Sequence, residues 1–509
     1  MTNDVPVRRL EEAPEPDARC VGALPPETVA AWLHERIGKR ETDGVRRLGL
    51  RRTKASRNQQ RLWHRHQATA AGDHSAPFML RRISGHVDVP ALASALDAVV
   101  ERHEILRTTY HASGPDVYQV VNTPVPIGLR EEILSGASAT ERQRMLREAV
   151  ESTVRHAFDL ENGSVIRARF FALGPGEHAL LLVVHHIAID VWSSAVLLAD
   201  LAETYQAIRE RRQPRLPAMP VQYSDFSEWQ RQGMQLATQE GDRRYWRAQL
   251  RGVPPGTTLV HGRLLTATPS RTEVPLPVHV SATDVADMEH LGRGVGASIF
   301  MVLLSAFSYV VAQWSGRWDV VVGCPVPSRP VPEVEPLVGL FVNMLPLRTR
   351  VTPSDTFRQL LERVRDTTLD GYDHQQLFFE DIAREASPAE EASQEPLVRI
   401  AFAYDEVNAS PRAAQGLGKP MTIPFAGQQH YDLSAVVTRF DDGVRGTVSF
   451  PAGLFDPSAI QRFVHDFLNT LGAAVRNPDC PLRNLPARDI CNTRGTASPT
   501  DSQSGGTPQ

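Results

Sequence analysis

The chain has 509 residues, of which 41% are hydrophobic and 22% are charged, and its formal net charge is −4. This composition is typical of a soluble globular protein, and the length has room for two to four lobes at roughly 100–200 residues each. The slightly acidic balance excludes a protein-wide basic field for nucleic acid, and no polybasic run flanks an apolar helix.

Cysteine usage and the chain start point to the cytoplasm. The cysteines are Cys20, Cys324, Cys480 and Cys491. None forms a CxxC pair, which argues against a disulfide framework or a zinc site. The first residues lack the basic and apolar regions of a signal peptide, and apolar runs such as 179–184 are far too short to span a bilayer. We therefore expect a soluble cytoplasmic protein without a bound metal.

Residues 1–50 are expected to form a flexible extension with one short helix. Residues 1–24 are rich in Pro, Glu and Arg, a composition typical of poor order. A helical pattern then begins, and its apolar face carries Val29, Trp32, Leu33 and Ile37. We expect this face to pack on the neighbouring domain. Docking to a partner protein is the alternative.

Residues 51–220 alternate between helical and strand patterns and form the first predicted lobe. The spacing of apolar residues predicts helices at 88–103, 140–158 and 194–211, and strands at 108–110, 117–121, 165–173 and 179–187. A proline-rich stretch at 214–220 closes this lobe.

Residues 221–490 continue the alternation and form the second predicted lobe. We expect helices at 243–250, 299–314, 357–372 and 456–475, and strands at 271–280, 319–323, 397–404, 433–440 and 444–450. Ser281 is the expected N-cap of a further helix. Residues 491–509 are rich in Ser, Thr, Gly and Pro and are expected to be disordered. The alternation predicts an α+β or α/β fold.

One stretch of the first lobe carries candidate chemistry. The predicted strand at 179–187 ends in His185 and His186, and Asp190 follows four residues later. Successive side chains of a strand point to opposite faces, so one histidine is expected to face a site while the other packs behind it. The alternative is that both are core histidines bonded to backbone carbonyls. Trp192 is expected in the lobe core, and Ser193 and Ser194 are expected to cap the next helix.

Residues 185–191 resemble the HHxxxDG motif of the condensation domains of nonribosomal peptide synthetases. Other motifs of that family are matched in order. They lie at 56–63, 102–110, 223–229, 338–348, 374–380 and, weakly, 395–398. The resemblance covers residues 54–485. Four motif positions depart from the family. Asn58 stands where it usually has Ala, Val191 stands where its motif has Gly, and Gln376 and Phe378 stand where its sixth motif usually has Asp and Pro.

The resemblance implies a fold and a reaction. The expected fold is a pair of chloramphenicol-acetyltransferase-like lobes in a V with a central tunnel. The expected reaction joins a carrier-bound acyl or aminoacyl thioester to an amine, with His186 as the catalytic residue and His185 as its packed neighbour. Ester formation with a hydroxyl acceptor and a non-catalytic recruitment platform are the alternatives.

The resemblance also implies partners and a structural ion pair. The chain shows no carrier-protein, adenylation or thioesterase motif. We therefore expect a free-standing enzyme whose substrates are presented on the phosphopantetheine of separate carrier proteins, with no bound cofactor. Asp190 and Arg329 are expected to pair and hold the loop, as their counterparts do in the family. A glycine at the position of Val191 usually allows a positive φ or a close approach of another backbone segment. The valine here therefore predicts that the loop either does not need that conformation or has a different shape.

Overall fold

The structure is a computed structural model that describes most of the chain. The described residues are 44–68, 76–134, 138–232, 236–253, 256–264, 270, 272–329, 331–386, 396–406, 417–421 and 430–485. The predicted N-terminal helix and the predicted C-terminal tail both lie outside the described residues.

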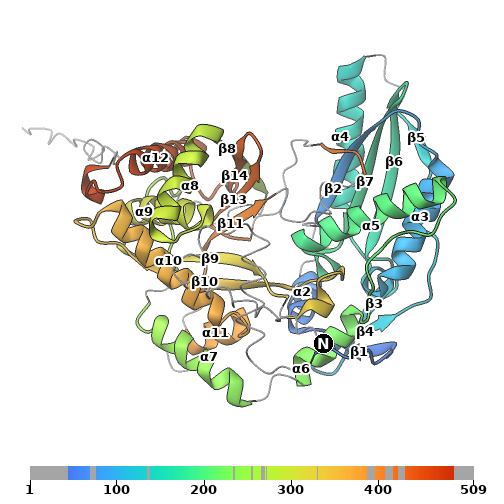
Figure 1. The fold of residues 1–509 in the computed structure, drawn as a ribbon, viewed down its shortest axis with the longest axis horizontal. Helices are drawn as coiled ribbons and strands as arrows, with labels where there is room; N and C mark the ends of the chain where they lie inside the picture. Colours follow the sequence, from blue (N-terminus) through green and yellow to red (C-terminus); the bar gives the residue numbers. More distant parts are fainter. Residues whose placement is uncertain are drawn as a thin grey trace, which may run out of the picture.

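Two lobes lie side by side, and each contains a β-sheet with helices packed against it (Figure 1). Most strand pairs are antiparallel, with parallel pairing where β5 meets β6 and where β11 meets β9 and β13. This mixture confirms the predicted α+β class.

The first lobe is built on a five-stranded sheet in the order β12-β2-β7-β6-β5 and a three-stranded sheet in the order β1-β4-β3. Its strands are β1 (Arg52–Lys54), β2 (Phe78–Ser84), β3 (Thr108–Ser113), β4 (Asp116–Val121), β5 (Glu131–Ile133), β6 (Ile166–Gly174), β7 (Glu177–Val184) and β12 (Lys419–Pro420). Its helices are α2 (Arg57–Ala68), α3 (Val89–Arg102), α4 (Ala139–Arg155), α5 (Val191–Arg209) and α6 (Tyr223–Gln232), with short 3₁₀ turns η2 (Glu104–Arg107) and η3 (His186–Ala188).

Strand β7 is the central strand of this lobe's five-stranded sheet, and its residues are apolar on both faces. Residues 179–184 are fully buried between β2 on one side and β6 on the other. A strand covered on both faces reads as a continuous aliphatic run rather than an alternating one. The motif histidines follow directly from its end, so the best-buried strand of the lobe positions them.

The second lobe is built on a six-stranded sheet in the order β10-β9-β11-β13-β14-β8. Its strands are β8 (Glu273–Ser281), β9 (Asp319–Pro327), β10 (Val342–Arg350), β11 (Ile400–Glu406), β13 (Leu433–Phe440) and β14 (Gly443–Pro451). Its helices are α7 (Leu236–Gln249), α8 (Ala282–Val295), α9 (Ile299–Ser315), α10 (Phe357–Asp373), α11 (Phe379–Ala386) and α12 (Pro457–Arg476), with 3₁₀ turns η4 (Pro332–Val334) and η6 (Leu482–Asn484).

Side-chain caps begin helices in both lobes, and the cap predicted at Ser281 is confirmed. Asp88 accepts a hydrogen bond from the backbone N–H of Ala91 at the start of α3, and Ser281 accepts one from Asp284 at the start of α8. Helix α9 is apolar all round and is almost wholly buried, as expected for the central helix of a large core.

Two segments from the second half of the chain are part of the first lobe. Val334, Leu337 and Phe341, between β9 and β10, belong to the core of the first lobe. Strand β12 pairs with the edge of β2, so residues of the second half extend the first lobe's sheet. The predicted division between residues 220 and 221 stays a prediction. The structure shows that side chains from both sides of it share one core.

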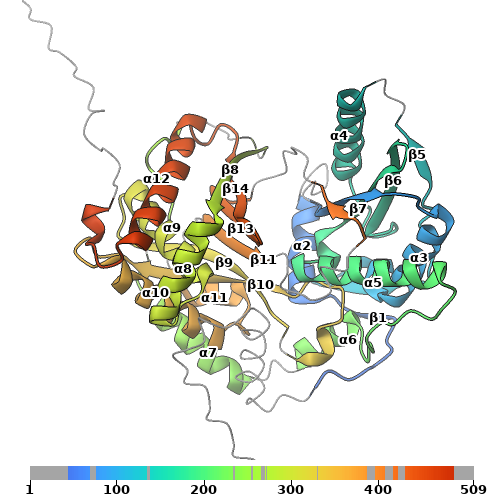
Figure 2. The same cartoon turned by 45° about the horizontal axis from the view of Figure 1, so that its top comes forward.

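Helix α2 lies on the side of the first lobe that faces the second in both views (Figures 1 and 2). Its Arg57 pairs with the buried Asp381 of α11, and Arg61 pairs with Glu380 of the same helix at 3.3 Å. These ion pairs join the lobes directly.

Within the described residues, no single helix is long and apolar enough to cross a bilayer; α8 and α9 pass that test only together, with a 98° bend between them. In the same part of the chain, no group of three His, Cys, Asp or Glu side chains is placed to hold a metal ion.

Replacing Asp381 tests the junction between the lobes. Its side chain is 1% exposed and also pairs with Arg384 and, at 3.8 Å, with Arg243, so Asp381→Asn removes a buried charge from three arginines. We expect a loss of about 1–3 kcal/mol, below the usual cost of breaking a buried pair because all three arginines reach solvent. The midpoint of urea unfolding measures it. Arg384→Gln is the matched control and should cost at most about 1 kcal/mol; equal losses would contradict a role for Asp381 between the lobes.

Candidate functional site

The predicted strand at 179–187 ends earlier than expected, at Val184. The chain then enters the 3₁₀ turn η3, and the Nδ1 atom of His185 accepts a hydrogen bond from the backbone N–H of Ile187 at 3.1 Å. The prediction that both histidines belong to the strand is therefore wrong. His185 is the N-cap of the turn, and His186 is its first residue.

His185 is a buried structural residue of this turn. Its ring stands edge-on to His66 at 5.1 Å and to Phe158 at 5.6 Å between centroids. Because its Nδ1 accepts a hydrogen bond from the backbone N–H of Ile187, the proton of the neutral ring is on Nε2.

His186 has the opposite tautomer. Its Nδ1 atom lies 3.0 Å from the carbonyl oxygen of Ile189. A carbonyl only accepts, so Nδ1 carries the proton and Nε2 keeps its lone pair. The side chain is half-buried, and this burial lowers the pKa of His186 below its ordinary value. At neutral pH the ring is therefore a neutral imidazole whose Nε2 can accept a proton.

Asp190 joins the histidine turn to the second half of the chain. Its Oδ1 accepts from the backbone N–H of Ser193 at 2.8 Å and so caps α5. Its Oδ2 accepts from the backbone N–H of Phe341 at 2.8 Å, and Arg329 lies 3.5 Å from the carboxylate. The structure thus brings the predicted pair Asp190 and Arg329 together, and both side chains are buried.

Arg329 holds the segment that follows β9. Its guanidinium donates to the carbonyl of Val334 and, at 3.0 Å, to that of Leu337. It also lies over the ring of Phe341, 4.0 Å from the centroid. The segment folds around this one cation, whose charge Asp190 balances.

Ser193 and Ser194 do not cap the next helix as expected. Helix α5 begins at Val191, and Asp190 is its N-cap. The hydroxyl of Ser193 instead donates to the carbonyl of Gly339 at 2.7 Å and accepts from Arg329 at 2.8 Å. Ser194 donates to the carbonyl of Asp190. A carboxylate one position before the helix competes better for its N–H groups than the hydroxyls within its first turn.

Val191 is accommodated without backbone strain. Among the described non-glycine residues only Arg211 has a positive φ, so Val191 takes an ordinary helical conformation at the first position of α5. Its side chain is 66% exposed. The backbone at this position does not require glycine, and valine adds an exposed aliphatic group beside the histidine turn.

Trp192 and two histidines that lie within the matched motifs have structural roles. His103 contacts the buried Asp200 at 3.0 Å, and His374 contacts Asp242 at 2.7 Å. Trp192 packs at the edge of the first core.

Sequence reasoning gave no role to three residues that hold the segment against the first lobe. Asn58 donates to the carbonyl of Val342 at 2.7 Å, and the Tyr223 hydroxyl donates to that of Leu340 at 2.8 Å. A Cβ on Gly339 would meet the Tyr223 ring at 2.2 Å, so only glycine fits there. All three lie in matched motifs, which is the signal that could have marked them.

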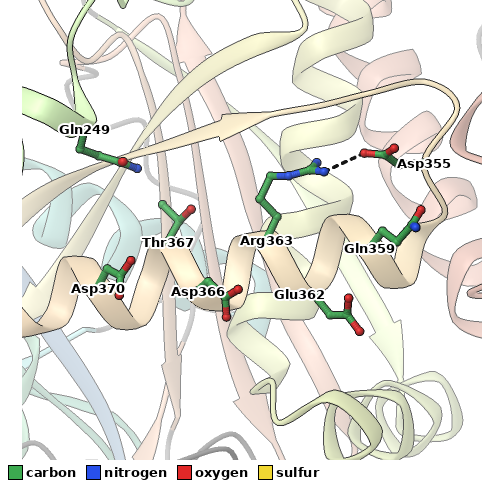
Figure 3. A pocket seen from close by; sticks show the side chains of 8 residues that line it. All are labelled: Gln249, Asp355, Gln359, Glu362, Arg363, Asp366, Thr367 and Asp370. Atoms are coloured by element: carbon green, nitrogen blue, oxygen red, sulfur yellow. Dashed lines mark hydrogen bonds and ion pairs between the residues drawn. The ribbon is translucent and has the colours of Figure 1, made fainter.

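A polar depression of about 430 Å³ lies on α10, within the second lobe (Figure 3). Carboxylates and one arginine line it, and Arg363 pairs with Asp355 at 2.8 Å. None of its lining residues belongs to the histidine motif. A mixed set of charges on one helix face is ordinary solvated surface, and we assign it no function.

Comparison with known proteins identifies the group to which this architecture is similar. The sequence model of the Condensation domain family matches residues 51–489. A component of the linear gramicidin synthase of Brevibacillus parabrevis is 33% identical over 411 residues, which are 80% of this chain but only 5% of that protein.

Solved structures share the fold. The X-domain in the complex of the X-domain and OxyB from teicoplanin biosynthesis superposes with a TM-score of 0.74 at 24% identity, covering 87% of this chain and 98% of that one. The first condensation domain of the calcium-dependent antibiotic synthetase, in complex with a substrate analogue, gives a TM-score of 0.69 at 22% identity, covering 85% and 98%.

Removing the Asp190 carboxylate tests whether it holds the segment. Asp190→Ala strands the buried Arg329 charge, and we expect a loss of about 3–5 kcal/mol together with a lower yield of soluble protein. Ser138→Ala is the matched control, since Ser138 is exposed and its hydroxyl caps α4. It should cost about 1 kcal/mol. Chemical denaturation compares the two. An Asp190→Ala protein that folds normally but has no activity would contradict the structural assignment.

Val191→Gly tests whether the loop tolerates valine without strain. Glycine should reduce stability by less than about 1 kcal/mol, because it weakens the first turn of α5 and relieves nothing. Thermal unfolding measures this, with Val191→Ala as the reference. A clear stabilisation by glycine would mean that the valine backbone is strained.

Proposed function

This chain belongs to the condensation domain family, and from that premise we propose that it joins an acyl or aminoacyl thioester to an amine, forming an amide in nonribosomal peptide biosynthesis. It spans about 5% of the length of the gramicidin synthase relative, so its substrates and partners are proposals in their own right. The observation that carries the proposal is His186, a neutral imidazole with its Nε2 lone pair available.

The reaction asks for one proton acceptor. The amine nitrogen attacks the thioester carbon, and the C–N bond forms as the carbonyl oxygen becomes an oxyanion. Nε2 of His186 takes the proton that the nitrogen loses. The intermediate then collapses, the C–S bond breaks, and the proton passes to the departing thiolate. Because the thioester is already activated, the step needs no covalent enzyme nucleophile.

Two features of the site favour the neutral form of His186. The Ile189 carbonyl fixes the tautomer that leaves Nε2 free, and half-burial keeps the ring deprotonated at neutral pH. His185 cannot take this role, because its Nδ1 lone pair already caps the turn.

The proposed substrates are carried on the phosphopantetheine arms of carrier proteins, and the enzyme is proposed to act without a cofactor of its own. A cytoplasmic location remains a prediction. Ester formation differs only in the acceptor atom, a hydroxyl in place of an amine. A recruitment platform is the alternative of another class, and it is supported by the likeness of the fold to an X-domain found in complex with OxyB.

A donor acyl group loaded on a carrier protein and offered to amine and hydroxyl acceptors separates these alternatives. We expect amide formation, reduced about 10²–10⁴-fold in His186→Ala because a general base is lost. His86→Ala removes an exposed histidine and is the matched control. Equal turnover by His186→Ala would remove His186 from the mechanism. Only ester product would favour the hydroxyl acceptor, and no turnover with any carrier would favour the platform.

The pH profile gives an independent check. Since the pKa of His186 lies below its ordinary value, the base form is complete at neutral pH and is lost as the pH falls through that lowered pKa. We expect the acid limb of kcat/KM that depends on His186, identified as the limb that His186→Ala lacks, to lie below the ordinary range of histidine. The α-ammonium group of an aminoacyl acceptor titrates separately, at about pH 8, and its limb should be present in both proteins. A His186-dependent limb above about pH 7 would contradict the assignment.

A further inference from the structure

The hydroxyl of Tyr223, at the start of α6, is buried where three parts of the chain meet. It donates to the carbonyl of Leu340 at 2.8 Å and lies 2.9 Å from the hydroxyl of Ser56, the residue before α2. Since the tyrosine proton is directed at the carbonyl, Ser56 is the donor of the second bond. Burial raises the pKa of Tyr223, so the phenol keeps its proton at neutral pH.

The Tyr223 side chain contacts three consecutive residues of the segment between β9 and β10. Gly339 lies so close to the ring that an added Cβ would overlap it. The carbonyl of Leu340 accepts from the hydroxyl, and the ring of Phe341 packs edge-on at 5.1 Å between centroids. One side chain therefore fixes the path of residues 339–341.

This stretch leads directly to the catalytic imidazole. The backbone N–H of Phe341 donates to the carboxylate of Asp190 at 2.8 Å. The peptide group that joins Ile189 to Asp190 carries the carbonyl that accepts from Nδ1 of His186 at 3.0 Å. A peptide group is planar, so the position of Asp190 fixes the direction of that carbonyl.

We propose that Tyr223 is a positioning residue of this site that acts through His186. Its side chain holds residues 339–341, and the N–H of Phe341 in turn places Asp190. The carbonyl of Ile189 then stays against Nδ1 of the imidazole, and Nε2 keeps the lone pair that proton transfer requires. The inference rests on the proposed function for its purpose, though not for its test.

Removing the Tyr223 hydroxyl should displace the carbonyl without unfolding the turn. Asp190 would keep two partners, the backbone N–H of Ser193 at 2.8 Å and the guanidinium of Arg329 at 3.5 Å. In a neutral imidazole, the hydrogen bond at one ring nitrogen decides which nitrogen carries the proton. A displaced Ile189 carbonyl therefore allows the Nε2–H tautomer, in which the lone pair needed for catalysis is lost.

The test is ¹⁵N NMR of the histidine rings in the full chain, at a pH where His186 is neutral, and it needs no substrate. The shifts of the two ring nitrogens report which one carries the proton, and those of His186 are assigned by their loss in His186→Gln. Tyr223→Phe removes the hydroxyl and keeps the ring. We expect a measurable share of His186 to move to the Nε2–H tautomer in this variant.

Tyr309→Phe is the matched control. The Tyr309 hydroxyl is also buried, donates to the carbonyl of Leu482 at 2.6 Å and accepts from Gln313 at 2.9 Å, within the core of the second lobe. Its loss removes the same kind of hydrogen bond at a place with no link to Asp190. The ring nitrogens of His186 should stay at their wild-type shifts.

Turnover gives a second measurement. A lost hydrogen bond of this kind corresponds to roughly 2–10-fold in the tautomer ratio. We expect kcat of Tyr223→Phe to fall by no more than this factor with KM unchanged, because the bound substrate meets fewer rings in the accepting form. Tyr309→Phe should keep the wild-type kcat.

Each outcome decides the question. Unchanged His186 nitrogens in folded Tyr223→Phe overturn the inference, and so does an equal change in Tyr309→Phe. Phe341→Leu replaces Tyr223→Phe if that variant does not fold, since leucine keeps the backbone N–H and removes the ring that packs on Tyr223. If neither variant folds, these contacts serve folding alone and the inference fails. Failure of the proposed function would appear separately, as absent turnover by the wild-type protein with the tautomer change intact.

Discussion

The carboxylate of Asp190 is the interaction on which the rest of this structure depends. One oxygen ends the histidine turn by capping α5, and the other accepts from Phe341, a residue that lies between two strands of the second lobe. The charge is balanced by Arg329, around which that segment folds. Burying such a pair is costly unless every partner is present, so the turn and the segment form together.

Two adjacent histidines acquire different chemistry because the backbone around them differs. Beside His185 the nearest backbone group is an N–H, and beside His186 it is a carbonyl. Each ring adopts the tautomer that its hydrogen-bond partner requires: Nδ1 of His185 accepts, whereas Nδ1 of His186 donates, so that Nε2 of His186 keeps its lone pair. The residue type is the same, and the local hydrogen bond decides its role.

The lobes are joined by three different kinds of contact. Arginines of α2 meet acidic residues of α11, the segment after β9 enters the first core, and β12 extends the first lobe's sheet. Gly339 and Tyr223 show how close this packing is, since a single added carbon would overlap the tyrosine ring. The histidine turn packs on α2, and Asp190 beside it accepts from Phe341 of the segment after β9, so its geometry depends on both halves of the chain.

The sequence by itself determined the elements whose cause is local. Periodic apolar residues predicted the central helix α9 and the strand β13, and Ser281 predicted the start of the helix that it caps. The ordered motifs indicated the family, and with it the pairing of Asp190 with Arg329.

Only the tertiary structure decided what depends on neighbours distant in sequence. It ended the central strand at Val184, gave the helix cap to Asp190 and turned the Ser193 hydroxyl toward Gly339. It also showed that Val191, which stands where the family motif has glycine, has an ordinary helical backbone. Apolar periodicity indicates which side chains are buried, but it does not indicate which backbone N–H or carbonyl group a polar side chain will contact. That choice fixes the histidine tautomers, and it is made by the packed chain.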